Sequence, residues 1–122
     1  MEIKEVSIRQ NPKVLVTDFL EAVQDGFDRH GVASKVILPD EATECPYVVT
    51  YTARRSWDIM PYLSYAEVTI SRDGKQVAQA VYHLRARGGL SPLKWATTKE
   101  KMDPVMDDLL KYQNHPWLKR GL

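Results

Sequence analysis

The 122-residue chain has the usual length of one domain, so residues 1–122 are expected to form a single domain with a core over 3–112 and a tail over 113–122. Its 17 basic and 16 acidic residues nearly cancel and no dense basic run occurs, which argues against nucleic-acid binding. No apolar run approaches the roughly 20 residues that span a bilayer, so no transmembrane segment is expected.

The first part of the chain predicts a strand followed by a helix. Apolar and polar residues alternate over 3–8, which is the period of a half-buried strand. A single apolar stripe with helical spacing then runs over 19–30. Asp18 is the expected N-cap with Glu21 as its reciprocal partner, and Gly31 stands where a left-handed C-terminal cap belongs.

Four further strands are predicted after this helix. Residues 32–38 are rich in β-branched side chains, and 46–54 has a composition that suits a pleated surface. Strands over 63–72 and 76–85 flank Asp73-Gly74, a strong signal for a two-residue hairpin turn. Residues 55–61, between the second and third of these strands, are expected to form a loop.

A second helix is predicted near the C-terminus, with two alternative starts. Thr97 and Glu100 have the spacing of a capping box. Asp103 could instead be the N-cap, because Pro104 is favoured in a first helical turn and clashes further inside a helix. Either start gives the same apolar stripe, formed by Met102, Val105, Met106, Leu109 and Leu110.

The order β-α-β-β-β-β-α predicts an α+β fold, a two-layer sandwich in which one mixed sheet carries both helices on one face. The first β-α-β is expected to be a right-handed parallel crossover, and the later strands a meander. The residues expected to face the helices are Ala66, Val68, Ile70, Ala78, Ala80, Tyr82 and Leu84. The opposite face is expected to meet solvent or a partner; it carries Thr69, Ser71, Gln79 and His83.

No catalytic or metal-binding motif is found in the sequence. The histidines, His30, His83 and His115, do not stand at metal-ligand spacings. Cys45 is the one cysteine, so it can form neither an internal disulfide nor a CxxC ligand pair. We therefore expect no catalytic residue, no metal and no cofactor.

One candidate binding patch follows from the predicted meander. The third and fifth predicted strands, 46–54 and 76–85, run in the same direction, so the loops that follow them emerge at the same edge of the sheet. Aromatic residues and arginine are typical of recognition surfaces. The favoured alternative is that Trp57 and Trp95 fold inward and close the core, while the arginines still form a basic rim for an anionic partner. The patch comprises Arg54, Arg55, Trp57, Asp58, Tyr62, Arg85, Arg87, Lys94 and Trp95.

Several short motifs, in order and spacing, resemble the Sbal-type lipoprotein family of small proteobacterial envelope proteins. They are Cys45-Pro46-Tyr47, the segment 50–58, Pro61-Tyr62-Leu63, Arg72-Asp73-Gly74, Gly88-Gly89-Leu90, Lys94-Trp95-Ala96 and Met102-Asp103-Pro104. The resemblance implies a signal with a lipid-attachment cysteine upstream of residue 1. It also implies a second cysteine in the first strand, where this chain has Ser7, and that departure argues against a disulfide here. It supplies no catalytic residue.

Three functional hypotheses follow. The first is a non-enzymatic envelope domain, in the periplasm or at the outer membrane and lipid-anchored in full-length form, that binds or scaffolds an envelope protein or an anionic envelope component. The second is a cytosolic protein-interaction module, since Met1–Glu5 has no hydrophobic signal core. The third is a small hydrolase that uses the loops over 55–62 and 86–96. The upstream reading frame distinguishes the first two.

Overall fold

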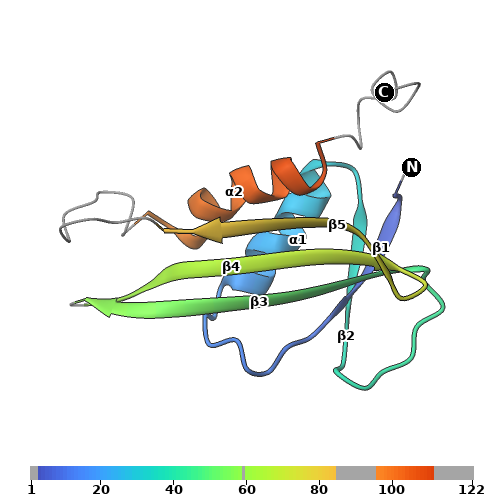
Figure 1. Cartoon of the computed structure of the whole chain (residues 1–122), viewed down its shortest axis with the longest axis horizontal. Helices are drawn as coiled ribbons and strands as arrows, with labels where there is room; N and C mark the ends of the chain where they lie inside the picture. The colour runs from blue at the N-terminus through green and yellow to red at the C-terminus, as the bar shows by residue number, and fades with distance from the viewer. Residues whose placement is uncertain (1–2, 59, 85–95, 112–122) are drawn as a thin grey trace.

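The structure, a computed structural model, describes residues 3–58, 60–84 and 96–111. These residues form a five-stranded sheet in the order β2-β1-β3-β4-β5, and both helices lie together on one of its faces (Figure 1). The predicted α+β fold with the order β-α-β-β-β-β-α is confirmed. The elements are β1 (Glu5–Arg9), α1 (Phe19–Arg29), β2 (Ala33–Ile37), β3 (Tyr47–Asp58), β4 (Met60–Arg72), β5 (Lys75–His83) and α2 (Thr98–Leu109).

The sheet is mixed, as expected. β1 pairs in parallel with both β2 and β3, whereas β4 is antiparallel to β3 and to β5. The last three strands therefore form the predicted meander. Asp73 and Gly74 have φ values of 50° and 83°, the positive values that a two-residue hairpin turn requires at both central positions. Gly31 also has a positive φ, 73°, at the predicted C-terminal cap of α1.

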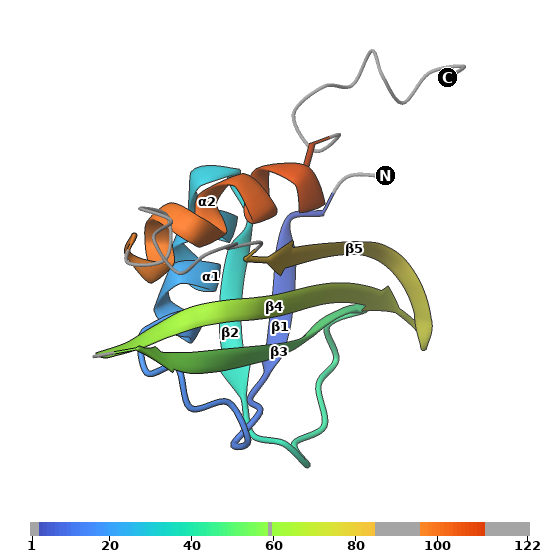
Figure 2. The ribbon, with the colours of Figure 1, turned by 60° about the vertical axis from the view of Figure 1, so that its left-hand side comes forward.

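The connection over 38–46 crosses the sheet on the face opposite the helices (Figure 2). β2 and β3 are parallel and have β1 between them, so this connection must pass over β1. It packs on Ser7, whose Oγ lies 2.9 Å from Thr43 Oγ1 and which is only 1% exposed. The β1-α1-β2 connection moves toward β2 on the helix face, whereas this connection moves from β2 toward β3 on the other face. Because both the direction and the face are reversed, the two crossovers have the same handedness. The predicted open polar face is thus covered over β1.

Arg9 fixes the start of this crossover. Its Nη1 donates to the carbonyl oxygens of Leu38 (3.4 Å), Pro39 (2.8 Å) and Glu41 (3.0 Å). The Glu41 side chain in turn accepts from the Leu38 N–H at 3.1 Å. The guanidinium therefore satisfies carbonyl groups that no strand partner reaches, and the turn is held against the end of β1.

The core lies between the sheet and the two helices. Six of the seven residues expected to face the helices are buried or pack on the core, and Leu84 is half-buried. The face of β4 alternates as predicted, with Thr69 and Ser71 more exposed than Val68 and Ile70. The largest fully buried side chains are Phe19, Phe27, Ile8, Ile37, Ile70, Met102 and Met106.

The helix starts decide one alternative and correct one prediction. The Thr97–Glu100 capping box is present, so α2 begins at Thr98 and contains Pro104, and the start at Asp103 is wrong. At α1 the predicted capping role of the Asp18 side chain is wrong, because that side chain makes no cap hydrogen bond. Its Oδ1 instead accepts from the Thr98 hydroxyl at 2.8 Å, and this contact ties the starts of the two helices together.

Candidate binding surface at the end of the β3–β4 hairpin

The predicted loop over 55–61 is wrong, because β3 and β4 continue as a hairpin to Asp58 and Met60. β5 ends at His83, opposite Tyr65, so within the described residues β4 is an edge strand beyond that level. A proline without an N–H is tolerated at an edge, which explains how Pro61 can lie in a strand. The hairpin consequently projects past the end of β5 (Figure 1).

A register shift separates the two arginines of the predicted patch. It lies between Arg54 and Arg55, which pair with Tyr65 and Leu63. Arg54 places its guanidinium carbon 5.2 Å from the Tyr65 ring centroid, a cation–π contact. Arg55 lines a groove on the helix side of the hairpin. Both arginines also line a second hollow, of about 420 Å³, together with Tyr62.

Trp57 is 73% exposed, and the interpretation that it folds inward to close the core is wrong. Met60 on the facing strand is 53% exposed, and Leu15 on the connection before α1 is 59% exposed. The reason is geometric: Trp57 pairs with Pro61 near the end of a hairpin that outruns the strand beside it. The fold thus leaves a large aromatic side chain in solvent.

Leu15 and Met60 line a groove of about 360 Å³, and so does Pro61, the residue that pairs with Trp57. Three segments far apart in sequence line it together with Arg55: residues 15–18, residues 60–63 and residues 96–98. The local signals in the first and third segments predicted helix starts and not a binding surface, because only tertiary contacts bring these segments to the hairpin. The exposed apolar side chain of Leu15 is the one hint that residues before α1 have a surface role.

Lys101 fastens α2 beneath the hairpin. Its Nζ donates to the Leu63 carbonyl at 2.9 Å and lies 5.4 Å from the Tyr62 ring centroid. The residue is only 6% exposed, and this burial lowers the pKa of its ammonium group. Tyr62, a predicted patch residue, is therefore held in place by a buried cation from α2.

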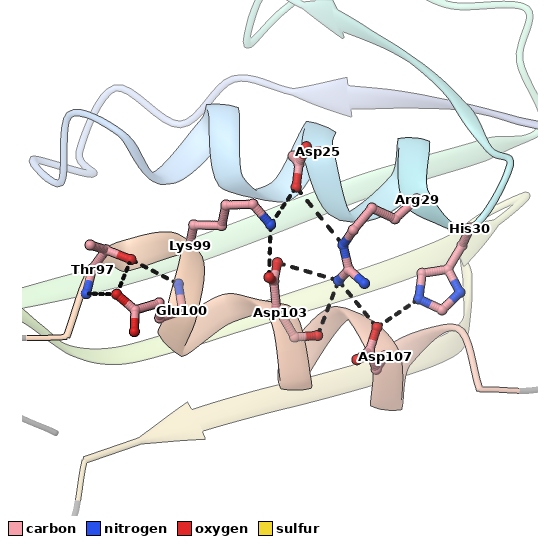
Figure 3. A network of polar contacts seen from close by, with 8 residues as sticks. All are labelled: Asp25, Arg29, His30, Thr97, Lys99, Glu100, Asp103 and Asp107. Carbon is pink, nitrogen blue, oxygen red and sulfur yellow. Dashed lines mark hydrogen bonds and ion pairs between the residues drawn. The ribbon is translucent and has the colours of Figure 1, made fainter.

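A network of ion pairs connects the two helices (Figure 3). Lys99 Nζ lies 2.7 Å from Asp103 and 2.9 Å from Asp25, and hydrogen bonds to these carboxylates, Asp103 first, raise the pKa of Lys99. Arg29 Nη2 lies 3.3 Å from Asp103 and 3.1 Å from Asp107. These contacts join α1 to α2 along their facing sides.

The network ends at His30, whose Nε2 lies 2.8 Å from Asp107 Oδ1. The hydrogen bond from His30, and next the charge of Arg29, lower the pKa of Asp107 despite an opposing effect of desolvation. Because the folded-state pKa lies below the unfolded value of about 3.9, ionised Asp107 stabilises the fold above that value. This contribution is lost as the pH falls through the folded-state pKa.

Asp107→Asn is therefore expected to reduce the acid-dependent loss of stability. The carboxylate is 53% exposed and screened, so the difference should be about 0.2–1 kcal/mol. Urea unfolding at about pH 6, where the carboxylate is ionised, and at about pH 2, well below the unfolded-state pKa, measures it. His30→Gln should remove much of the same difference, and the two effects should not add. Equal acid losses in wild type and Asp107→Asn would contradict the assignment.

Part of the predicted patch lies outside the described residues, namely Arg85, Arg87, Lys94 and Trp95. Of the rest, the structure gathers Arg55, Trp57 and Tyr62 around the hairpin, places Arg54 over Tyr65, and makes Asp58 the last residue of β3.

The described part of the chain shows no group of three or more His, Cys, Asp or Glu side chains able to hold a metal ion. Among the same residues, no helix combines the length and apolar character needed to cross a membrane. Cys45 Sγ lies 3.4 Å from both the Glu5 and the Tyr47 carbonyl oxygens. Thr43 Oγ1 contacts both Ser7 Oγ and the Cys45 N–H, so Ser7 and Cys45 lie close to each other, on either side of Thr43.

No protein-family model and no curated protein matches the chain. Two solved structures are similar to it. A minor lipoprotein from Acinetobacter baumannii is 15% identical over 96% of this chain and 94% of that one, with a TM-score of 0.41. A PelC variant from Paraburkholderia phytofirmans, described as a dodecamer, is 12% identical over 86% of this chain and 89% of that one, with a TM-score of 0.45. Both likenesses are remote and carry no inference about activity or partners.

Proposed function

We propose that this domain is a non-enzymatic cell-envelope module that binds or scaffolds another envelope component through the end of its β3–β4 hairpin. The observation that carries the proposal is the 73% exposure of Trp57 beside the groove that Arg55 lines. Exposing an indole ring to water is unfavourable for an isolated domain. Its presence at a projecting hairpin end is explained if a partner covers it.

The composition of this surface fits a binding role. Tryptophan and arginine are the residues that most often carry binding energy at interfaces, and methionine is also enriched there. Trp57 and Met60 would supply apolar contact, and Arg55 a fixed cation at the groove. A partner that presents an anionic group next to an apolar surface is complementary to that arrangement.

The envelope location rests on the resemblance to the Sbal-type lipoproteins described above. The alternative is a cytosolic interaction module. A signal sequence ending in a lipid-attachment cysteine, encoded in frame upstream of Met1, would support the envelope location. A gene that starts at Met1 would remove it without affecting the binding role of the hairpin.

Binding is tested with three anionic probes: lipopolysaccharide, phosphatidylglycerol vesicles and polygalacturonate, with phosphatidylcholine vesicles as the neutral control. We expect at least one anionic probe to bind, and Trp57→Ala and Arg55→Glu each to weaken it about tenfold or more, as for side chains at the centre of an interface. Arg72→Glu, at the opposite end of β4, is the matched charge reversal and should leave the affinity unchanged.

Binding that is equal in wild type and in both hairpin variants would refute the assigned surface. Failure of all anionic probes would refute the proposed partner chemistry. Urea unfolding of each variant checks that the fold is retained. Both substituted side chains are largely in solvent, so each should change the free energy of unfolding by no more than about 0.5 kcal/mol.

A further inference from the structure

The free edge of β5 is a second surface, distinct from the hairpin end. We propose that it accepts an extended segment of a partner protein as a sixth strand, seated in the groove between β5 and α2. The inference does not depend on the hairpin proposal, because it rests on different residues.

The backbone of β5 presents hydrogen-bonding groups outward. β5 is the last strand of the sheet and, within the described residues, pairs with β4 alone. The Leu84 N–H donates to the Ser64 carbonyl at 3.0 Å. Because antiparallel pairs alternate, Tyr82 and Ala80 also direct their backbone groups at β4, and the intervening residues direct theirs outward. The outward residues are Gln79, Val81 and His83.

A groove of about 580 Å³ runs beside this edge, between β5 and α2. Val81 and Tyr82 line it from the strand, and Pro104 and Val105 from the helix. Side chains of an added strand would point alternately into this groove and onto the open face of the sheet. On the open face they would meet Val81, 49% exposed, and Val77, 36% exposed. Both sides of an incoming strand would therefore find apolar contacts.

β5 also lacks the usual protection of an edge strand. Exposed edges are commonly guarded by charged side chains or proline. Residues 76–82 contain neither. The opposite edge, β2, is only five residues long and carries Lys35 at its centre. Of the two edges of the described sheet, β5 is therefore the receptive one.

A strand that followed α2 in the same chain would be unfavourable at this edge. β5 runs parallel to β1, because it is antiparallel to β4, which is antiparallel to β3. Consider a strand that follows α2 and pairs in parallel with the free edge of β5. The connection from β5 through α2 to that strand would run on the helix face, as the β1-α1-β2 connection does, but toward the opposite edge of the sheet. It would have the opposite hand to that connection, and parallel crossovers are right-handed in about 98% of cases.

A second copy is disfavoured by charge. Glu100 and Asp108 of α2 also line the groove, and an edge-to-edge dimer would bring two such acidic pairs together. The groove-lining cation Lys101 is directed away, to the Leu63 carbonyl beneath the hairpin. His83 lies at the end of the groove. The acidic pair instead suits a partner segment that carries lysine or arginine.

The spacing of the acids defines the partner further. Glu100 and Asp108 are eight residues apart on one side of a helix, which is about 12 Å along its axis. About four strand residues cover that distance. The expected segment therefore has basic residues at positions i and i+4, and an apolar residue at i+2 facing Pro104 and Val105.

In the test, the synthetic peptide Thr-Lys-Thr-Val-Thr-Lys-Thr is titrated into the whole chain, and binding is monitored by NMR. Binding should slow amide exchange of Gln79, Val81 and His83. A peptide with both lysines replaced by glutamate, and one N-methylated at alternate amides, should each lose binding. On the protein, Val81→Pro removes an outward N–H without a ladder bond and should weaken binding more than tenfold. Unfolding curves verify that this variant folds.

The charge contribution is tested with Glu100→Gln/Asp108→Asn, which keeps an acceptor at the capping position. It should weaken the lysine peptide about five- to tenfold, the effect of two exposed ion pairs. Glu21→Gln/Asp28→Asn on α1 is the matched control and should bind like wild type. The proposal is overturned if Val81→Pro binds normally, or if the peptide leaves the Val81 amide unprotected. It is also overturned if Gln79 and Val81 are already protected in the free protein. Trp57→Ala should bind this peptide normally, which separates this edge from the hairpin surface.

Discussion

Gly26→Val is expected to lower the free energy of unfolding by about 3 kcal/mol, the upper part of the range for an overpacked core. Gly26 is buried where α1 meets α2. A Cβ at this position would overlap Met106 Cγ and would lie 2.7 Å from Met106 Cβ. The Met106 Cβ is fixed to the α2 backbone and cannot rotate away, so the helices would have to separate. Urea unfolding followed by circular dichroism measures the loss.

Two alanine variants separate steric overlap from backbone effects. Gly26→Ala gains about 1 kcal/mol of helix propensity, so its net loss should be smaller, about 1–2 kcal/mol. Gly31→Ala meets no atom within 4 Å but must adopt a φ of +73°, which costs about 1–2 kcal/mol without any clash. Met106→Ala should relieve Gly26→Ala only in part, since it keeps the Cβ. Wild-type stability of Gly26→Val would contradict the close helix packing.

Local periodicity was sufficient for the sheet and helices, because their signals lie within one element. The alternation over 66–70 and the Asp73-Gly74 turn placed β4 and β5 correctly. The two candidate starts of α2 could not be ranked from sequence. The capping box is accompanied by a bond from Thr98 to Asp18, a residue eighty positions earlier. The same bond explains why Asp18 does not cap α1.

The candidate site was harder to predict, because its shape depends on how far neighbouring strands extend. Residues 55–61 were expected to form a loop, yet Pro61 lies in β4, at a level where the described residues place no β5 beside it. The average burial of tryptophan favoured an inward Trp57, but a projecting hairpin has no core to receive it. Alternation alone also could not place a bulge between Arg54 and Arg55. The groove segment over 15–18 showed only a helix-capping motif, which says nothing about a contact with the hairpin.

Arg9→Met is expected to lower the free energy of unfolding by about 2 kcal/mol, because hydrogen bonds from a charged donor contribute about 1.5–3 kcal/mol. The substitution keeps much of the aliphatic length and removes the donor shared by the carbonyls of Leu38, Pro39 and Glu41. The crossover over 38–46 should then open locally. Its opening would release Cys45, whose thiol now contacts the carbonyls of Glu5 and Tyr47.

The rate of Cys45 modification by a disulfide reagent reports this opening directly, and it should rise in Arg9→Met well before global unfolding. Arg72→Met is the matched control. Arg72 is exposed, lies 3.9 Å from Asp73, and contacts the ring and the hydroxyl of Tyr47, the hydroxyl at 3.3 Å. None of these contacts involves the crossover over 38–46, so thiol reactivity should stay at the wild-type rate. Ser7→Ala, which removes the 2.9 Å contact with Thr43, should also raise the rate, with a smaller loss of about 1 kcal/mol for a neutral hydrogen bond. If only Ser7→Ala accelerates the modification of Cys45, the hydroxyl contact between Ser7 and Thr43 holds the crossover in place. The guanidinium of Arg9 would then not contribute to holding it.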